Sequence, residues 1–197
     1  MGKLDRIKEA IDRCKASGID AIKLQLFPNE AKYTDVGNVY LSHELFRLAF
    51  EYGKSVDFPV TASVFDMESY YFLRNLQPLF IKFAYSQKHQ WWIKDCIDHR
   101  MEAIVSCDVM TDSLVPSGAL KLYCIPEYPV RYEISFDELF PRFDGFSDHT
   151  LGIRQTANAI KAGAEIIEKH VKLGYGDETC PDARFAVGVE DFASLRK

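Results

Sequence analysis

Short apolar runs alternate with amphipathic segments along nearly the whole chain. Residues 4–18 repeat apolar side chains at helical spacing and end at a glycine, and the apolar run IDAIKLQLF follows as a predicted strand. Further strands are predicted at 58–65, 79–85, 102–107, 120–125, 144–150 and 164–173. Further helices are predicted at 42–55, 66–76, 88–100, 135–143 and 151–163, and a last one from 188.

This alternation favours an α/β fold with a parallel sheet. Seven predicted strands come close to a TIM-type (β/α)8-like barrel, which usually needs about 250 residues, but this chain has 197 and begins on a helix. We therefore expect one domain over residues 1–197, a barrel that is incomplete because its first strand is absent. A doubly wound open sheet is the alternative, although no GxGxxG phosphate loop supports it.

Composition narrows the classes of partner. Hydrophobic residues make up 47% of the chain, enough for a sizeable core, and the net charge is -5 with basic and acidic residues interspersed. This balance gives no nucleic-acid footprint, and no apolar run approaches the roughly 20 residues of a membrane span. The five cysteines form no CxxC pair, which is typical of reduced thiols, so we expect a cytoplasmic protein.

Polar side chains stand at the predicted carboxyl ends of six strands, where parallel barrels gather their functional groups. They are Lys23, Gln25, Ser63, Lys82, Ser106, Ser147, Asp148, His149, Glu168 and His170. A purely structural barrel would need none of them.

Two pairs among these residues leave alternatives open. Lys23 and Lys82 interrupt apolar strands, so each buried ammonium would need a partner, either an anionic ligand or the carboxylate of a neighbouring strand. Either lysine could instead point outward between helices. His149 and His170 follow neighbouring strands and suit a divalent metal with open positions. The spacing alone favours two unrelated histidines, one of them capping the helix that follows, because a histidine pair is not specific without a third ligand.

Longer motifs add a family resemblance. The stretch GFSDHTLGI…AGAEIIEKHVKL resembles the sialic acid synthase hallmark G-Y-S-D-H-T-x-G followed by G-A-x-x-I-E-K-H-F. Five further segments are similar to segments of that family and occur in the same order. They are GIDAIKLQLF, VTASVFDMESYYFL, AIVSCDVM, YCIPEYPV and CPDARFAVGVEDF. The resemblance covers almost the whole chain.

The resemblance implies a transferase of sialic acid biosynthesis. Such enzymes condense phosphoenolpyruvate with an N-acetylmannosamine-type sugar, an N-acetylated hexosamine, to a nine-carbon 2-keto acid and release phosphate. A divalent metal, expected to be Mn2+, polarises the sugar aldehyde. The implied metal ligands are His149 and His170, and the implied substrate-binding residues are Lys23, Gln25, Ser63, Lys82, Ser106, Ser147 and Asp182.

The departures from the family pattern concern catalysis. We expect that the family's first strand, whose glutamate lies in the active site, and its C-terminal antifreeze-like domain are both absent. Tyr85 stands where the family has a small serine, Gln87 where it has a carboxylate, Pro126 where it has a serine and Ala183 where it has a histidine. Glutamine cannot act as a general acid or base.

Two functions therefore stay open. The first is a working synthase; the second is a catalytically degenerate or truncated relative that binds a sugar acid or serves as an interaction module. Without the first strand the barrel has two open edges, which predicts dimerisation, as a homodimer, or donation of a strand by a neighbour. Neither the sugar nor turnover follows from the sequence.

Overall fold

The computed structural model describes residues 3–27, 41–140, 142–174 and 182–196. Seven parallel strands form one sheet in which each strand pairs with the next along the chain, in the order β1 to β7. They are β1 (Ile22–Leu26), β2 (Val60–Val64), β3 (Phe80–Phe83), β4 (Glu102–Cys107), β5 (Leu120–Cys124), β6 (Gly145–Asp148) and β7 (Ile166–Lys169).

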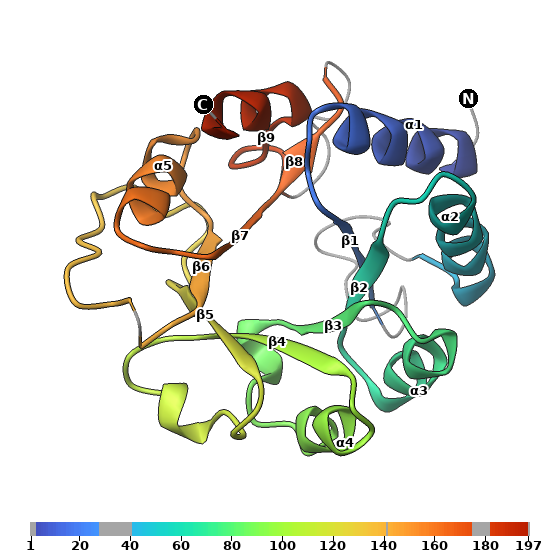
Figure 1. Ribbon diagram of the computed structural model, residues 1–197, viewed down its shortest axis with the longest axis horizontal. Helices are drawn as coiled ribbons and strands as arrows, with labels where there is room; N and C mark the ends of the chain where they lie inside the picture. The colour runs from blue at the N-terminus through green and yellow to red at the C-terminus, as the bar shows by residue number, and fades with distance from the viewer. Residues whose placement is uncertain (1–2, 28–40, 141, 175–181, 197) are drawn as a thin grey trace.

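Helices surround this sheet on its outer side (Figure 1). They are α1 (Lys3–Ala16), α2 (His43–Ser55), α3 (Met67–Leu76), α4 (Trp92–Asp98) and α5 (Arg154–Lys161). Three 3-10 helices, η3 (Tyr85–Gln87), η4 (Asp112–Leu114) and η5 (Val189–Arg196), and a second sheet of β8 (Val171–Lys172) and β9 (Val187–Gly188) complete the described elements. None of the described helices combines the length and apolar character that a membrane crossing requires.

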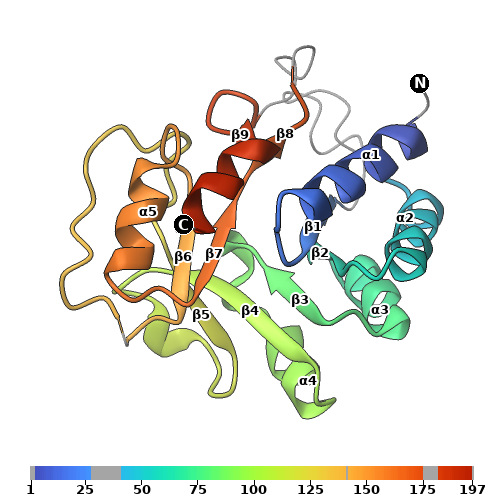
Figure 2. The ribbon, with the colours of Figure 1, turned by 45° about the horizontal axis from the view of Figure 1, so that its top comes forward.

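The strands curl into an incomplete barrel, as predicted. Within the described ranges, β1 and β7 each pair on one side only and not with each other. The first helix and the C-terminal 3-10 helix lie side by side over this opening (Figures 1 and 2). Arg13 of α1 joins them, because its guanidinium donates to Glu190 Oε1 at 2.5 Å and to the Leu173 carbonyl at 2.5 Å.

Local sequence signals start two of the outer helices. Ser42 and Asp66 have extended backbone, and their side chains accept hydrogen bonds from the backbone N–H groups of Leu45 and Ser69. Each cap satisfies an N–H group that the first helical turn leaves without a partner. The prediction of Asp66 as an N-cap is thereby confirmed.

The apolar core lies between the sheet and these helices. All five residues of β2 are buried, as expected for a parallel strand covered on both faces. The largest side chains with no more than 1% exposure in this layer include Phe46, Tyr70, Phe83 and Phe146. This core fixes the outer face of each strand and leaves the alternate residues to point into the barrel.

Three predicted elements differ from the structure. Residues 137–140 and 142 form turns where a helix was predicted over 135–143. Phe136, Leu139 and Phe143 are buried, and the proline that the sequence has at 141 disfavours helical backbone at the residue before it. The helix expected from 88 begins only at Trp92, and the last helix is the 3-10 helix η5. The seventh predicted strand breaks at His170, after which β8 leaves the main sheet and pairs with β9.

Candidate functional site

The barrel interior holds a cavity of about 340 Å³. All nine residues that the sequence singled out as substrate or metal ligands line it, and they are Lys23, Gln25, Ser63, Lys82, Ser106, Ser147, His149, His170 and Asp182. Strand register explains this convergence, because Gln25 pairs with Ser63, Ser63 with Lys82, and Ser147 with Glu168. Side chains at matching heights on parallel strands point to the same face.

A carboxylate that the sequence left without a role sits between the two lysines. Glu168 lies 2.8 Å from Lys23 Nζ and 3.3 Å from Lys82 Nζ, and it accepts a hydrogen bond from Ser147 Oγ at 2.7 Å. Burial by itself raises the pKa of Glu168, but the two lysines outweigh burial and hold that pKa well below its ordinary value. The pairing of the lysines with a neighbouring strand's carboxylate is therefore confirmed, and both lysines also line the cavity.

The two lysines differ in how many donors they have left. Lys82 is 3% exposed and uses its three N–H groups on Ser106 Oγ, the Phe83 carbonyl and Glu168. Lys23 is 19% exposed and contacts Ser63 Oγ and Glu168, which leaves one N–H for a ligand. Burial lowers the pKa of Lys82, and Glu168 partly opposes that effect. Lys82 thus holds the neighbouring pocket side chains in place, whereas Lys23 keeps one donor that can bind a ligand.

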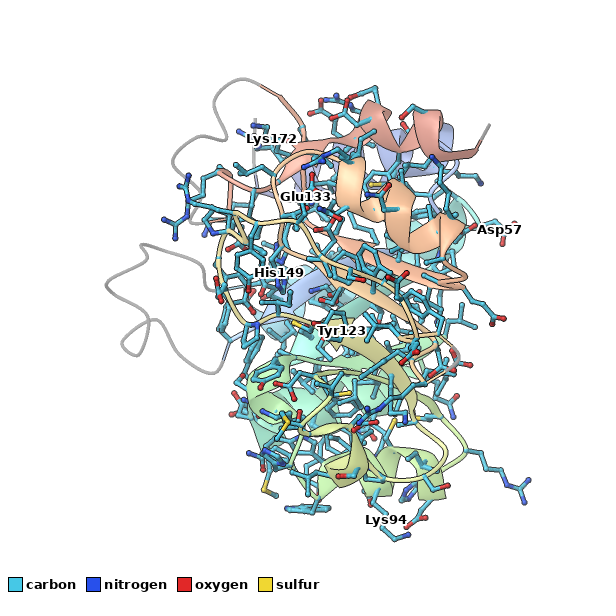
Figure 3. All side chains as sticks on the ribbon, turned by 90° about the vertical axis from the view of Figure 1, so that its left-hand side faces the viewer. Asp57, Lys94, Tyr123, Glu133, His149 and Lys172 are labelled. Carbon is cyan, nitrogen blue, oxygen red and sulfur yellow. The ribbon has the colours of Figure 1, made fainter. Side chains whose placement is uncertain are left out.

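The two histidines face each other at the carboxyl ends of β6 and β7. Their ring centroids are 5.6 Å apart, and the labelled His149 lies well inside the outline in Figure 3, away from the peripheral Lys94 and Asp57. Burial lowers the pKa of His149 to about 4, and His170 adds to that effect. His149 does not cap a helix, because α5 starts only at Arg154 and has no side-chain cap.

The donor chemistry of this pair fits a divalent metal. The Nδ1 of His149 lies 3.4 Å from the Ile125 carbonyl, and the Nδ1 of His170 lies 3.0 Å from Asp182 Oδ2. Hydrogen bonds of this kind fix the tautomer of ligating histidines and leave Nε2 for the ion. No cluster of three or more His, Cys, Asp or Glu side chains that could hold a metal occurs among the described residues. The remaining positions would therefore belong to water or substrate.

Asp182 links the metal-type pair to the substrate side of the cavity. Besides His170, it accepts a hydrogen bond from Gln25 Nε2 at 3.2 Å. Burial raises the pKa of this carboxyl, but His170 and Gln25 together lower it below its ordinary value. Asp182 is therefore an anion that orients its neighbours.

The departures from the family pattern take different places. Tyr85 and Pro126 line the cavity, and the Tyr85 hydroxyl donates to Asp108 at 2.6 Å. Gln87 and Ala183 lie outside its lining, although Ala183 borders a smaller hollow of about 180 Å³. The substitution at Tyr85 thus affects the pocket shape directly.

Sequence reasoning missed several lining residues. Phe27 and Phe65 follow β1 and β2 and stack at 4.4 Å between ring centroids, and Tyr128 lies against His149 at 4.3 Å. Cys124 also lines the cavity, but burial raises the pKa of its thiol to about 12, so it stays protonated. Of the sequence's five cysteines, Cys180 lies outside the described residues. One signal could have found Phe27 and Phe65, because each stands directly after an apolar strand.

Comparison with known proteins identifies the family of this chain. The model of the NeuB family matches residues 28–197, which is most of the chain.

The chain belongs to the NeuB family.

The relatives with assigned activities are sugar-acid synthases. The chain is 23% identical over 235 residues to a pseudaminic acid synthase of Campylobacter jejuni, covering 98% of this chain and 68% of that protein. It is 26% identical over 216 residues to the N,N'-diacetyllegionaminic acid synthase of Legionella pneumophila, covering 87% and 61%. The chain therefore spans roughly two thirds of the length of these relatives, 61% and 68%.

Solved structures agree on the fold. The N-acetylneuraminic acid synthetase of Leptospira borgpetersenii matches with a TM-score of 0.81 at 20% identity, over 98% of this chain and 76% of that one. A DAHP synthase of Thermotoga maritima matches with a TM-score of 0.74 at 9% identity, over 99% and 64%. The resemblance to the sialic acid synthase family and the incomplete TIM-type barrel are thereby confirmed.

Proposed function

We propose that this NeuB-family chain is the barrel of a nonulosonic acid synthase that condenses phosphoenolpyruvate with an N-acetylated hexosamine. One observation carries the proposal: two lysines and four serines line the same cavity as the histidine pair. Cationic and hydroxyl donors suit a ligand with phosphate and carboxylate groups. The names of the relatives supply the product class, a sugar acid.

Phosphoenolpyruvate binding is assigned to the lysine side. Lys23 retains a donor, and Ser63, Ser106 and Ser147 supply hydroxyl groups within the same cavity. Lys82 and Glu168 hold this arrangement together in the free protein. An anion that entered the cavity would compete with Glu168 for Lys23. The affinity for the anion therefore depends on the charges of Lys23 and Glu168.

The acceptor sugar is assigned to the histidine side. A divalent metal, which we expect to be Mn2+, would be held by His149 and His170, and it would polarise the sugar aldehyde. The enol carbon of phosphoenolpyruvate forms the new bond to the aldehyde carbon. Water then adds to the former C2 carbon, and phosphate leaves. Asp182 and Gln25 lie where they could hold sugar hydroxyls.

A second candidate is a relative that binds these ligands and does not turn them over. One observation favours it: both carboxylates of the described cavity lining are engaged, Glu168 by two lysines and Asp182 by His170. Neither is placed as a general acid for the departing phosphate. The lost acid at Gln87 adds to this argument.

Phosphate release separates the candidates. The assay supplies phosphoenolpyruvate and Mn2+ to the protein across a panel of N-acetylated hexosamines. We expect sugar-dependent release that His149→Ala abolishes and that His89→Ala, a change of an exposed histidine before α4, leaves intact. Absent release together with His149-dependent Mn2+ binding would favour the binding relative. Failure of Mn2+ and phosphoenolpyruvate to change the melting temperature would contradict both.

Assembly and location stay predictions. β1 and β7 each keep an unpaired edge among the described residues, so we still expect a homodimer or a strand donated by a neighbour. Light scattering measures this directly, and a strict monomer would contradict it. We expect the protein to act in the cytoplasm, where thiols such as those of the buried Cys14 and Cys96 stay reduced.

A further inference from the structure

The residues just before the two histidines meet on the outer face of the sheet. Asp148 of β6 and Lys169 of β7 are partners in the strand register, one position after the inward-facing pair of Ser147 and Glu168. Because side chains alternate along a strand, Asp148 and Lys169 point away from the cavity that His149 lines. The strand register thus places an outward-facing pair directly before the two histidines that line the cavity.

Asp148 and Lys169 form a fully buried ion pair. Lys169 Nζ lies 3.1 Å from Asp148 Oδ2, and both side chains have 0% exposure, which no other ion pair in the described ranges matches. Thr156 of α5 donates its hydroxyl hydrogen to the same carboxylate. The pair therefore ties β6, β7 and α5 together at one point.

The same two side chains also hold the backbone that follows His149. Asp148 Oδ1 accepts from the Thr150 N–H at 2.7 Å, and Lys169 Nζ donates to the Thr150 carbonyl at 2.8 Å. Both backbone polar groups of Thr150 are thus held by side chains on the outer face of the sheet. The backbone is therefore anchored on both sides of His149, by β6 at Asp148 and by these two bonds at Thr150.

Stability alone does not account for this pair. Removing two charges from water costs about as much as their attraction returns, and apolar residues of similar size often serve as well. A buried ion pair does fix the relative orientation of the segments that carry it, because its hydrogen bonds form in one arrangement only. Mutating a hydrogen-bond partner of a metal ligand typically costs about 10- to 100-fold in metal affinity or activity. Asp148 and Lys169 act through the backbone beside the histidines instead of through the histidine rings.

We propose that Asp148 and Lys169 are positioning residues that set the separation and orientation of His149 and His170 for a divalent ion. This inference rests on the proposed metal site. It assigns the pair no contact with substrate. Its consequence is that the double variant Asp148→Asn with Lys169→Met keeps the fold but loosens the metal site.

The test measures Mn2+ binding by electron paramagnetic resonance of the free ion, with the melting temperature recorded on the same samples. We expect the folded double variant to bind Mn2+ at least about tenfold more weakly than the parent. The matched control is Arg74→Met. This change removes a half-buried ion pair between Arg74 of α3 and Asp95 of α4, which lies away from the histidines. It should lower the melting temperature and leave Mn2+ affinity unchanged.

The outcomes separate this inference from the proposed function. Parental affinity in a folded double variant, with binding that still requires His149, overturns the positioning role alone. No Mn2+ binding by the parent overturns the metal site and the inference together. If the double variant does not fold, Thr156→Val replaces it, because that change removes one hydrogen bond to Asp148 at constant shape. A folded Thr156→Val protein with unchanged Mn2+ affinity would then overturn the inference, and measurably weaker Mn2+ binding would support it.

Discussion

Replacing Glu168 with glutamine tests whether the free protein depends on an internal counter-ion. The substitution keeps the size of the side chain and an oxygen that can accept from Ser147, but it removes the charge that faces Lys23 and Lys82. Lys82 is 3% exposed and would be left without a carboxylate. We therefore expect a less stable protein whose cavity attracts anions more strongly.

The size of the effect follows from burial. Removing one partner of a buried pair costs about 3–5 kcal/mol. Lys23 is 19% exposed and can be hydrated, and the amide oxygen still accepts hydrogen bonds, so we place the loss near the lower end, at about 3 kcal/mol. At about 2–4 °C per kcal/mol for a chain of this size, the melting temperature should fall by roughly 6–12 °C.

Thermal melts followed by circular dichroism, with and without inorganic phosphate, measure both effects. Phosphate should raise the melting temperature of Glu168→Gln more than that of the parent, since an external anion replaces the lost carboxylate. Glu165→Gln, an exposed change on the segment before β7, is the matched control and should behave like the parent. A variant that melts within about 2 °C of the parent, or equal phosphate shifts in both proteins, would refute the counter-ion role.

Two further predictions concern the frame of the site. Gly145→Ala should cost about 3 kcal/mol or more, seen as a lower urea midpoint, because a Cβ there would overlap the Ile166 carbonyl oxygen across β6 and β7; an unchanged midpoint would show that the two strands can move apart. Tyr70→Phe should cost about 1–2 kcal/mol, because the buried hydroxyl donates to Asp95 at 2.6 Å; the urea midpoint measures it, and equal loss in a protein already carrying Asp95→Ala would contradict that origin.

The order of elements was readable because each is a local property. Apolar runs of strand length and caps such as Ser42 and Asp66 act within a few residues of themselves, so the alternation of strands and helices followed from the chain alone. Residues 135–143 show the limit. Phe136 and Phe143 are buried by distant partners, and that burial overrides a helical pattern.

Many of the residues that line the cavity were readable from the sequence, but their interactions were not. All nine residues that the strand-end positions and the family motifs predicted line the cavity, whereas lining residues such as Phe27, Phe65 and Tyr128 were not predicted. The role of Glu168 was missed because a carboxylate becomes a counter-ion only when it meets Lys23 and Lys82 from other strands. Nothing in its own segment specifies that meeting.

The sequence by itself determined which residue types stand at each strand end, since alternation and helix signals are local. Only the tertiary structure decided that Lys82 has no free donor while Lys23 keeps one, and that Asp148 pairs with Lys169 behind the histidines. The physical reason is that distances, burial and charge pairing depend on strand register and barrel closure. These properties arise between segments that are far apart in the chain.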